Sequence, residues 1–246
     1  MKPRIRIGTA GWSIPRQHAD AFASGDSGLA RYATALDAAE INSSFYRPHQ
    51  ASTYARWAAT VPADFRFSAK LPKTISHELA LRGAGPALDR FLDEVAGLGR
   101  KLGGLLLQLP PSLAFDARAA ANFFAMLRRR TELPVTCEPR HPSWFAAPAE
   151  ALLLRYQVGR AAADPARVPA ASVPGADPSW SYFRWHGSPR IYYSAYEAPA
   201  LEALAAQVRA CAKGRQPLWV IFDNTAHGFA IRDALRLKAL LARPTG

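Results

Sequence analysis

The sequence predicts an α/β fold, a single (β/α)8 TIM-like barrel that spans residues 1–246. Eight segments with strand-like apolar patterns are separated mostly by helical segments, and a chain of this length commonly forms one such barrel. One segment, residues 105–109, is almost continuously apolar, which is typical of a parallel strand covered on both faces. Polar residues gather at the carboxyl ends of the segments, where this fold carries its functional site.

The first half of the chain supplies expected strands one to five. Most of them alternate between two faces with the two-residue period of a strand. They cover residues 4–10, 38–42, 65–71, 105–109 and a segment that begins near Pro134. The helices expected between them cover residues 29–36, 52–60, 86–102 and 116–129. Gly103 and Gly104 are expected to end the third of these helices, and Asp116 to cap the fourth.

The second half supplies expected strands six to eight, at residues 158–164, 180–186 and 217–224. Helices are expected at residues 149–156, 197–212 and 230–241. Prolines punctuate the segment between strands six and seven, so that crossover is expected to lack a regular helix. They are Pro165, Pro169, Pro174 and Pro178.

The chain carries a formal net charge of +12, which makes nucleic acid or another polyanion a candidate partner. The densest basic cluster is Arg128, Arg129 and Arg130. It closes a predicted helix, where cations complement the helix dipole, so we interpret it as structural. Whether the overall charge serves a function or reflects coding bias stays open.

The sequence indicates a protein of the cytoplasm with no membrane partner. No apolar run approaches the roughly 20 residues that cross a bilayer. Met1 to Arg4 lead directly into a strand without the apolar core of a signal peptide. Cys137 and Cys211 show no metal-binding spacing and are expected to be separate buried thiols. Nothing in the sequence indicates an oligomeric state.

Polar side chains at the strand ends are expected to converge on the mouth of the barrel. In strand five, Thr136, Glu138 and Arg140 share one face by the two-residue period. We assign the corresponding polar face of the other strands to the barrel interior and the bulky residues to the contact with the helices. The residues predicted at the mouth are Glu40, Asn42, Lys70, Gln108, Glu138, Arg140, Arg184, His186 and Asn224.

These strand ends resemble those of the YecE-like family, known as domain of unknown function 72, and the resemblance covers nearly the whole chain. It implies a TIM-like barrel and no established reaction, so function has to be argued from side chains. The sequence departs from the family pattern at Ala10, Pro139 and Asp223, where serine, an aromatic residue and asparagine are usual. The matching blocks are residues 8–12, 40–46, 67–72 with His77, 106–111, 138–144 and 184–187.

Glu138 and Glu40 are the predicted acid or base groups, because burial and neighbouring charge can tune the pKa of a carboxylate in a barrel mouth. The alternative is that they only neutralise the cations around them. His186 is the predicted proton shuttle or electrophile. Strands two and five lie far apart in an eight-stranded ring, so the two carboxylates need not touch. An inverting glycosidase pair, separated by roughly 6.5–9.5 Å, therefore stays open.

An anionic ligand, small or oligomeric and with phosphate allowed, is the partner that the mouth predicts. Lys70, Arg140 and Arg184 would form an anion clamp, in which arginine offers a bidentate fork. The first hypothesis is thus an enzyme of hydrolase or lyase type. The remaining residues expected to bind substrate are Gln108, Asn42, Asn224, Tyr46, Trp12, Trp144 and His141.

The second hypothesis is a metal-dependent nuclease or nucleic-acid-binding barrel similar to endonuclease-IV-type proteins. No cofactor is predicted, and the sequence lacks a close His-x-His or His-Glu-x-x-His spacing. The third hypothesis is a non-catalytic barrel that binds a ligand or partner. Serine nucleophile, phosphate-loop and dinucleotide motifs are absent. If a divalent metal is bound, the candidate ligands are Glu40, Glu138, His77, His141, Asp164 and His186.

Overall fold

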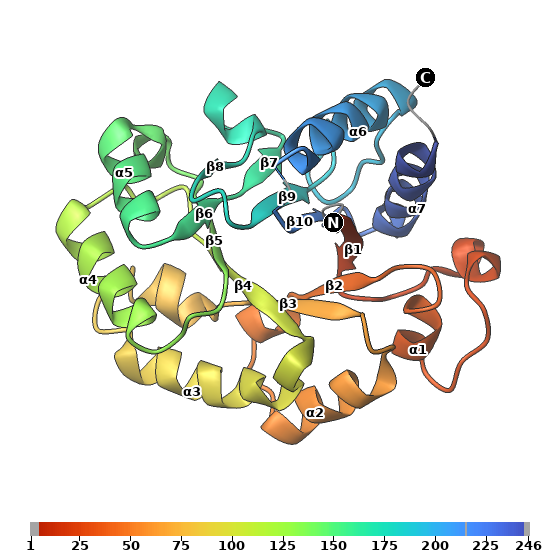
Figure 1. Cartoon of the computed structure of the whole chain (residues 1–246), viewed down its shortest axis with the longest axis horizontal. Helices are drawn as coiled ribbons and strands as arrows, with labels where there is room; N and C mark the ends of the chain where they lie inside the picture. The colour runs from red at the N-terminus through yellow and green to blue at the C-terminus, as the bar shows by residue number, and fades with distance from the viewer. Residues whose placement is uncertain (1–4, 215, 244–246) are drawn as a thin grey trace.

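A computed structural model describes residues 5–214 and 216–243, whose strands form one sheet surrounded by helices (Figure 1). Arg4, the first residue of expected strand one, lies outside the described residues. The hydrogen-bonded strand order is β7-β9-β10-β1-β2-β3-β4-β5-β6-β8. The strands are β1 Ile5–Ala10, β2 Ala38–Ile41, β3 Arg66–Lys70, β4 Leu102–Gln108, β5 Val135–Glu138, β6 Val158–Arg160, β7 Ala162–Asp164, β8 Gly175–Ala176, β9 Ser181–Trp185 and β10 Leu218–Phe222.

The sheet closes into a barrel through β6 and β7, which are the two halves of expected strand six. A single residue, Ala161, separates them, and its backbone N–H donates to the carbonyl of Cys137 on β5. β6 pairs in parallel with β5, and β7 pairs in parallel with β9. β8 adds a two-residue antiparallel pairing to β6. The ten strands therefore fill eight positions of a ring, and the predicted TIM-like barrel is confirmed.

The α-helices lie outside the ring, as Figure 1 shows. Between β7 and β9 the described chain contains only the short helix η6 Pro169–Ser172 and β8, as the prolines predict. Asp116 caps α4 as predicted, with its side chain accepting from the N–H of Ala119. The helices are α1 Gly28–Tyr32, α2 Ala51–Thr60, α3 Gly85–Val95, α4 Ala117–Arg128, α5 Ala147–Arg155, α6 Ala198–Ala212 and α7 Phe229–Ala242.

The prediction that Gly103 and Gly104 end a helix is wrong, because both residues lie in β4. The helical region before them ends earlier, as α3 gives way to the short helix η4 Ala96–Lys101. Two indole rings explain the glycines: a Cβ on Gly103 would lie 2.6 Å from Trp219, and one on Gly104 would lie 2.6 Å from Trp180. The glycines leave space for rings that fill the barrel interior.

Replacing Gly104 with alanine is expected to lower the free energy of unfolding by about 1–3 kcal/mol, the usual cost of overpacking a core. The new Cβ would also lie 2.8 Å from the carbonyl oxygen of Pro134, which is backbone and cannot turn away. Urea denaturation measures the effect. Gly28→Ala is the control, since a Cβ there meets nothing within 4 Å. Equal stability of Gly104→Ala and Gly28→Ala would contradict this account of β4.

The interior of the barrel is apolar at its centre and becomes polar toward the carboxyl ends of the strands. Trp180, Tyr182, Trp219 and Ile221 pack together inside the ring with Ala38 and Ala161. A larger apolar layer separates the outer face of the sheet from the helices. Because all strand pairs except β6 with β8 are parallel, polar residues after the strands meet at one mouth.

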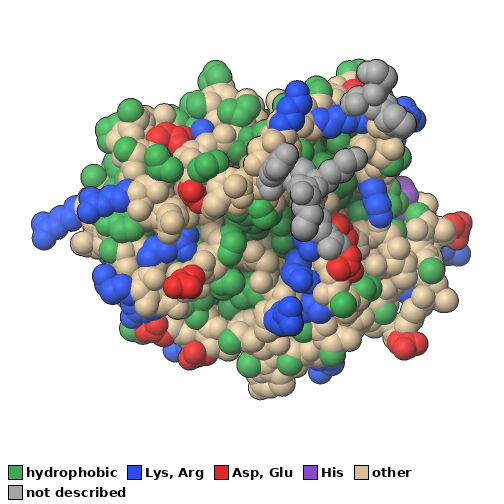
Figure 2. All heavy atoms as spheres, viewed as in Figure 1, with side chains coloured by type: hydrophobic (Ala, Val, Ile, Leu, Met, Phe, Trp, Pro, Cys, Tyr) green, Lys and Arg blue, Asp and Glu red, His purple; other side chains and the backbone are tan. Residues whose placement is uncertain are grey.

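The basic residues have local structural partners where they cluster most densely. Arg128 donates to the carbonyls of Leu133, Tyr156 and Gln157, and Arg130 pairs with Asp89. On the face seen in Figure 2, basic side chains are spread around the periphery with acidic ones among them. Within the described ranges, no helix is long and apolar enough to span a membrane.

Candidate functional site

Arg184 is the centre of a buried charge cluster at the mouth. Its side chain is fully buried and reaches carboxylates that come from three other strands. Nη2 lies 2.8 Å from Oε1 of Glu40, and Nη1 lies 3.1 Å from Oε2 of Glu138. Nη2 also lies 3.0 Å from Oδ2 of Asp223. Burial opposes the charge of Arg184, but Asp223, Glu40 and Glu138 keep its pKa well above the ordinary value.

Glu40 is sealed into the floor of this cluster. Both of its oxygens accept from Arg184, and Oε2 also accepts from the hydroxyl of Tyr182 at 2.9 Å. Tyr182 is itself hydrogen-bonded to Ser68. Arg184 therefore lies between Glu40 and Glu138, where an inverting glycosidase would place its attacking water. The arrangement fits a positioning role for Glu40 better than a catalytic one.

His186 is held by carboxylates on both sides of its ring. Nδ1 lies 3.0 Å from Oδ2 of Asp223, and Nε2 lies 3.0 Å from Oε1 of Glu138. A neutral imidazole carries one N–H, so only the imidazolium donates to both neighbours. Burial lowers the pKa of His186, yet Glu138 and Asp223 raise it above its ordinary value overall. The geometry thus favours a positively charged His186.

Glu138 connects the buried charge cluster to Arg140, which is partly exposed. It accepts from Nε of Arg140 at 3.0 Å, besides its contacts with His186 and Arg184. Burial raises the pKa of Glu138, but those three cations bring it well below its ordinary value. Glu138 is therefore ionised at neutral pH. His186 is the neighbour whose protonated form Glu138 stabilises, because Glu138 raises the pKa of the ring.

Lys70 and Arg140 add positive charge near the opening. Arg140 keeps 17% of its side chain exposed and donates to the hydroxyl of Tyr192 at 3.3 Å. Lys70 is buried, and its Nζ lies 4.0 Å from the centroid of the Phe45 ring. Burial, with help from Arg184, lowers the pKa of Lys70 to about 8. Lys70 forms no ion pair with a carboxylate in the described part of the chain.

The charges of the mouth leave a positive excess. Lys70, Arg140, Arg184 and protonated His186 face the carboxylates of Glu40, Glu138 and Asp223. Four positive groups against three carboxylates leave one net positive charge. Buried charges are costly unless balanced, so the mouth has an electrostatic preference for one further anion.

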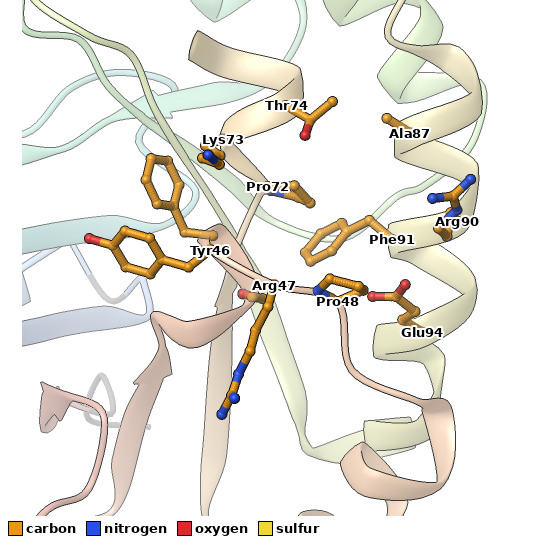
Figure 3. Close-up of a pocket in the computed structure, with 12 residues that line it drawn as sticks. Tyr46, Arg47, Pro48, Pro72, Lys73, Thr74, Ala87, Arg90, Phe91 and Glu94 are labelled. Atoms are coloured by element: carbon orange, nitrogen blue, oxygen red, sulfur yellow. The ribbon is translucent and has the colours of Figure 1, made fainter. Parts of the chain in front are cut away.

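Two hollows adjoin the cluster. A cavity of about 20 Å³ lies against Glu138, Arg140 and His186, roughly the room of one water molecule. A second pocket, of about 120 Å³, lies between the loop after β2 and helix α3 (Figure 3). Figure 3 shows Phe91 pointing into this pocket and Tyr46 pointing away from α3. Phe45 lines the pocket and also contacts the Lys70 ammonium, so the pocket and the mouth share one wall.

Some residues predicted to bind substrate are occupied elsewhere in the structure. Trp144 is 1% exposed, packs against Phe115 and donates from Nε1 to the carbonyl of Leu113. His141 contacts Ser143 through Nδ1 and caps the short helix η5 Pro142–Phe145. These two side chains stabilise the loop after β5. The two-residue alternation of a strand stops where the strand ends, so it does not fix the direction of side chains in that loop. We leave them out of the candidate site.

Asn224 also takes a structural position, since its face of β10 points outward. Its Nδ2 donates to Ser194 and to Asp233 at the start of α7. The inward position at this strand end belongs to Asp223, which the sequence analysis did not place in the site. Asp223 shares the alternating face of Trp219 and Ile221, both inside the barrel. That alternation points to Asp223 only once the inward face of β10 is known, because both faces of the strand are apolar.

The other predicted residues lie around the mouth without joining the cluster. Gln108 pairs in register with Glu138, and Asn42 begins the short helix η2 Ser43–Phe45 with its Oδ1 buried and unpaired. Tyr46 is 67% exposed. Trp12 packs against Trp57 and lines a separate cavity of about 570 Å³.

The candidate metal ligands are not brought together as a set. The described residues contain no group of three or more His, Cys, Asp or Glu side chains arranged to hold a metal ion. His77 contacts Ser76, and Asp164 accepts from the hydroxyl of Tyr196. Both ring nitrogens of His186 already face carboxylate oxygens, so neither offers a free lone pair.

Comparisons with known proteins agree on one family. The family model described as "Protein of unknown function DUF72" matches residues 6–246. Two curated relatives from Escherichia coli strains, both named UPF0759 protein YecE, are 32% identical over 143 residues. That alignment covers 58% of this chain, and the chain spans about half (50%) of the length of these relatives.

Solved structures match the whole barrel. A DUF72 family protein from Enterococcus faecalis superposes with a TM-score of 0.82 at 22% identity, covering 99% of this chain and 97% of that one. A DUF72 family protein from Thermotoga maritima gives a TM-score of 0.80 at 22% identity, covering 97% of this chain and 99% of that one. At this identity the likeness establishes the fold.

Proposed function

The chain belongs to the DUF72 family, and because membership brings a fold without a reaction, we propose a function from the side chains of the mouth. The protein is an enzyme of hydrolase or lyase type that transfers protons to or from a small anionic substrate. The observation that carries the proposal is the contact of both His186 ring nitrogens with carboxylates.

Each group of the mouth has a distinct role in this proposal. His186 supplies the proton, Glu138 stays ionised and sustains the imidazolium, and Asp223 fixes the ring from the other side. Proton transfer by a positioned side chain contributes typically 10²–10⁴-fold to a rate. Glu40, Arg184 and Tyr182 form a second hydrogen-bonded group, which holds Arg184 in position beside Glu138 and Asp223.

The proposed substrate is anionic because the mouth carries one positive charge more than it balances. Arg140 is the best placed to hold a carboxylate or phosphate, since it reaches the rim while its Nε stays anchored to Glu138. A guanidinium holds such groups with two parallel hydrogen bonds. The densest basic cluster of the sequence is engaged in local contacts, through Arg128 and Arg130, so a small anion at the mouth is the partner we propose.

Replacing Arg140 with methionine is expected to weaken the binding of small anions by about 10- to 100-fold, the usual value of hydrogen bonds to a charged group. Titration calorimetry with inorganic phosphate and with oxalate, on the wild type and the variant, measures this loss. Glu138 keeps His186 and Arg184 as partners in the variant, so folding is expected to survive.

Arg47→Met is the matched control, because Arg47 lines the neighbouring 120 Å³ pocket. Unchanged affinity in Arg140→Met, or an equal loss in Arg47→Met, would show that the mouth does not hold the anion. Anions bound by the wild type then define the substrates to assay for turnover.

A further inference from the structure

Lys70 is the one cation of the mouth that the proposed proton transfer does not use. Arg140, Arg184 and protonated His186 already match Glu40, Glu138 and Asp223 in number. The charge of Lys70 is therefore not needed to neutralise the carboxylates. A lysine that served only as a counterion would be expected in an ion pair, and Lys70 forms none within the described ranges.

The surroundings of Lys70 lower the cost of converting its ammonium to the neutral amine. Lys70 is the last residue of β3, at the carboxyl end of the barrel, and is 3% exposed. Its Nζ lies over the face of the Phe45 ring, 4.0 Å from the centroid, a cation–π contact that brings no carboxylate to the nitrogen. Desolvation and a neighbouring cation are the two conditions that activate a lysine as a nucleophile. Burial and Arg184 supply both, and they bring the pKa of Lys70 to about 8.

We infer that Lys70 is a nucleophilic amine that forms an imine with the carbonyl carbon of a small 2-oxo acid bound at the mouth. The inference rests on the proposed function, since it names the substrate class of the same site. Arg140 would hold the carboxylate of the 2-oxo acid, and Lys70 would attack the adjacent carbonyl carbon. Burial of Lys70 keeps most water away from the nitrogen.

The reaction balances without an added reagent. Lys70 first releases one proton, and the nitrogen lone pair then forms a bond to the carbonyl carbon while the C=O π pair moves to oxygen. The nitrogen then loses a second proton, the oxygen takes up both released protons and leaves as water, and the lone pair freed on nitrogen closes the C=N bond. One ammonium and one ketone thus give one protonated imine and one water. The positive charge stays on the nitrogen, where Glu40, Asp223 and Glu138 already stabilise a cation.

The imine explains why a cation and proton-transfer groups share this mouth. A protonated imine draws electrons from the neighbouring carbon, which makes a C–H or C–C bond at that carbon easier to break. His186 and Glu138 lie in the same cluster to handle the proton that such a step moves. Of the two reaction types proposed above, this chemistry favours the lyase.

Reductive trapping tests the inference. The wild type is incubated at about pH 8 with glyoxylate or pyruvate and sodium cyanoborohydride, and modified lysines are located by peptide mass spectrometry. At that pH about half of Lys70 is neutral, against roughly 0.4% of a lysine with the ordinary pKa of about 10.4. Lys70 is therefore expected to be labelled at least ~10-fold faster than Lys73, whose side chain is 50% exposed.

Two variants complete the experiment. Lys70→Arg keeps the charge but cannot form an imine, and is expected to lose the fast adduct while keeping its thermal melting temperature. Lys73→Arg is the matched control and is expected to keep the fast adduct. If Lys70 of the folded wild type is labelled no faster than Lys73 with either probe, the inference is wrong. Trapping requires no turnover, and anion binding at Arg140 is measured separately, so the two proposals fail independently.

Discussion

Replacing Arg184 with methionine is expected to lower the free energy of unfolding by about 3–5 kcal/mol, the cost of breaking a buried ion pair by removing one partner. Methionine fills a similar volume, so the loss is electrostatic. Three carboxylates depend on this one guanidinium, all of them buried. Urea denaturation at pH 7 measures the loss, and Arg56→Met, at an exposed position, is expected to change stability by no more than about 0.5 kcal/mol.

Glu40 carries most of the expected loss, which a double variant can test. Without Arg184, Glu138 keeps Arg140 and His186, and Asp223 keeps His186. Among the described residues, Glu40 keeps only the hydroxyl of Tyr182 as a hydrogen-bond donor. Adding Glu40→Gln to Arg184→Met is therefore expected to restore about 1–3 kcal/mol, because a neutral amide costs less to bury than an unpaired charge. If the double variant is less stable than Arg184→Met, the cluster is not organised around Arg184 as described.

The barrel and most of the cluster could be predicted because one face of several strands is visibly polar. Glu40, Lys70, Glu138, Arg184 and His186 all lie at the carboxyl ends where the two-residue alternation placed them. Alternation works when a polar and an apolar face differ in sequence. The strand containing Lys70 is an example, since its inward residues are polar and its outward ones aromatic or apolar.

Asp223 escaped prediction because β10 is apolar on both faces. Leu218, Val220 and Phe222 pack outward, whereas Trp219 and Ile221 pack inside the barrel. Nothing local distinguishes these faces, so the choice between Asp223 and Asn224 depends on which side the barrel closes. Closure is a long-range property that a single strand does not encode.

The positions of Trp144 and of the glycines of β4 could not be predicted for a related reason. The sequence does not show whether an aromatic residue after a strand lies at the mouth or packs against a neighbouring loop. Trp144 packs against Phe115, which lies in another loop. Gly103 and Gly104 look like a helix terminus, yet Trp219 and Trp180, more than 70 positions away, explain them. Contacts of this length are absent from local patterns.

The second large effect is expected at His186, whose replacement by glutamine should reduce turnover by about 10²–10⁴-fold if it is the proton donor. Glutamine retains hydrogen-bonding capacity toward Glu138 and Asp223 but cannot carry a proton charge. The assay uses whichever small anion proves to be turned over. His227→Gln is the control, since His227 is exposed, and it should keep the wild-type rate. Wild-type turnover in His186→Gln would reject the proposed role.

The pH dependence of stability tests the charge of His186 without any substrate. Its pKa is raised in the folded state, so the imidazolium contributes stability that is full below the unfolded value of about 6.5 and is lost as pH rises through the folded value. The pKa values of Glu138 and Asp223 are lowered, so their contribution is present above about 4 and is lost as pH falls through their folded values. The two signs together predict greatest stability between these limits.

His186→Gln should remove the alkaline limb of this curve and shift the acid limb to higher pH, because His186 also lowers the pKa values of Glu138 and Asp223. The difference in unfolding free energy between wild type and variant is expected to be largest near pH 6 and to shrink at higher pH, because wild-type His186 then loses its proton. Histidine C–H signals in NMR titrations report the same proton directly, and the signal missing from the variant identifies His186. A titration midpoint below 6.5 for that signal would mean that the two carboxylates do not hold an imidazolium, and the proton donor of the proposed mechanism would be lost with it.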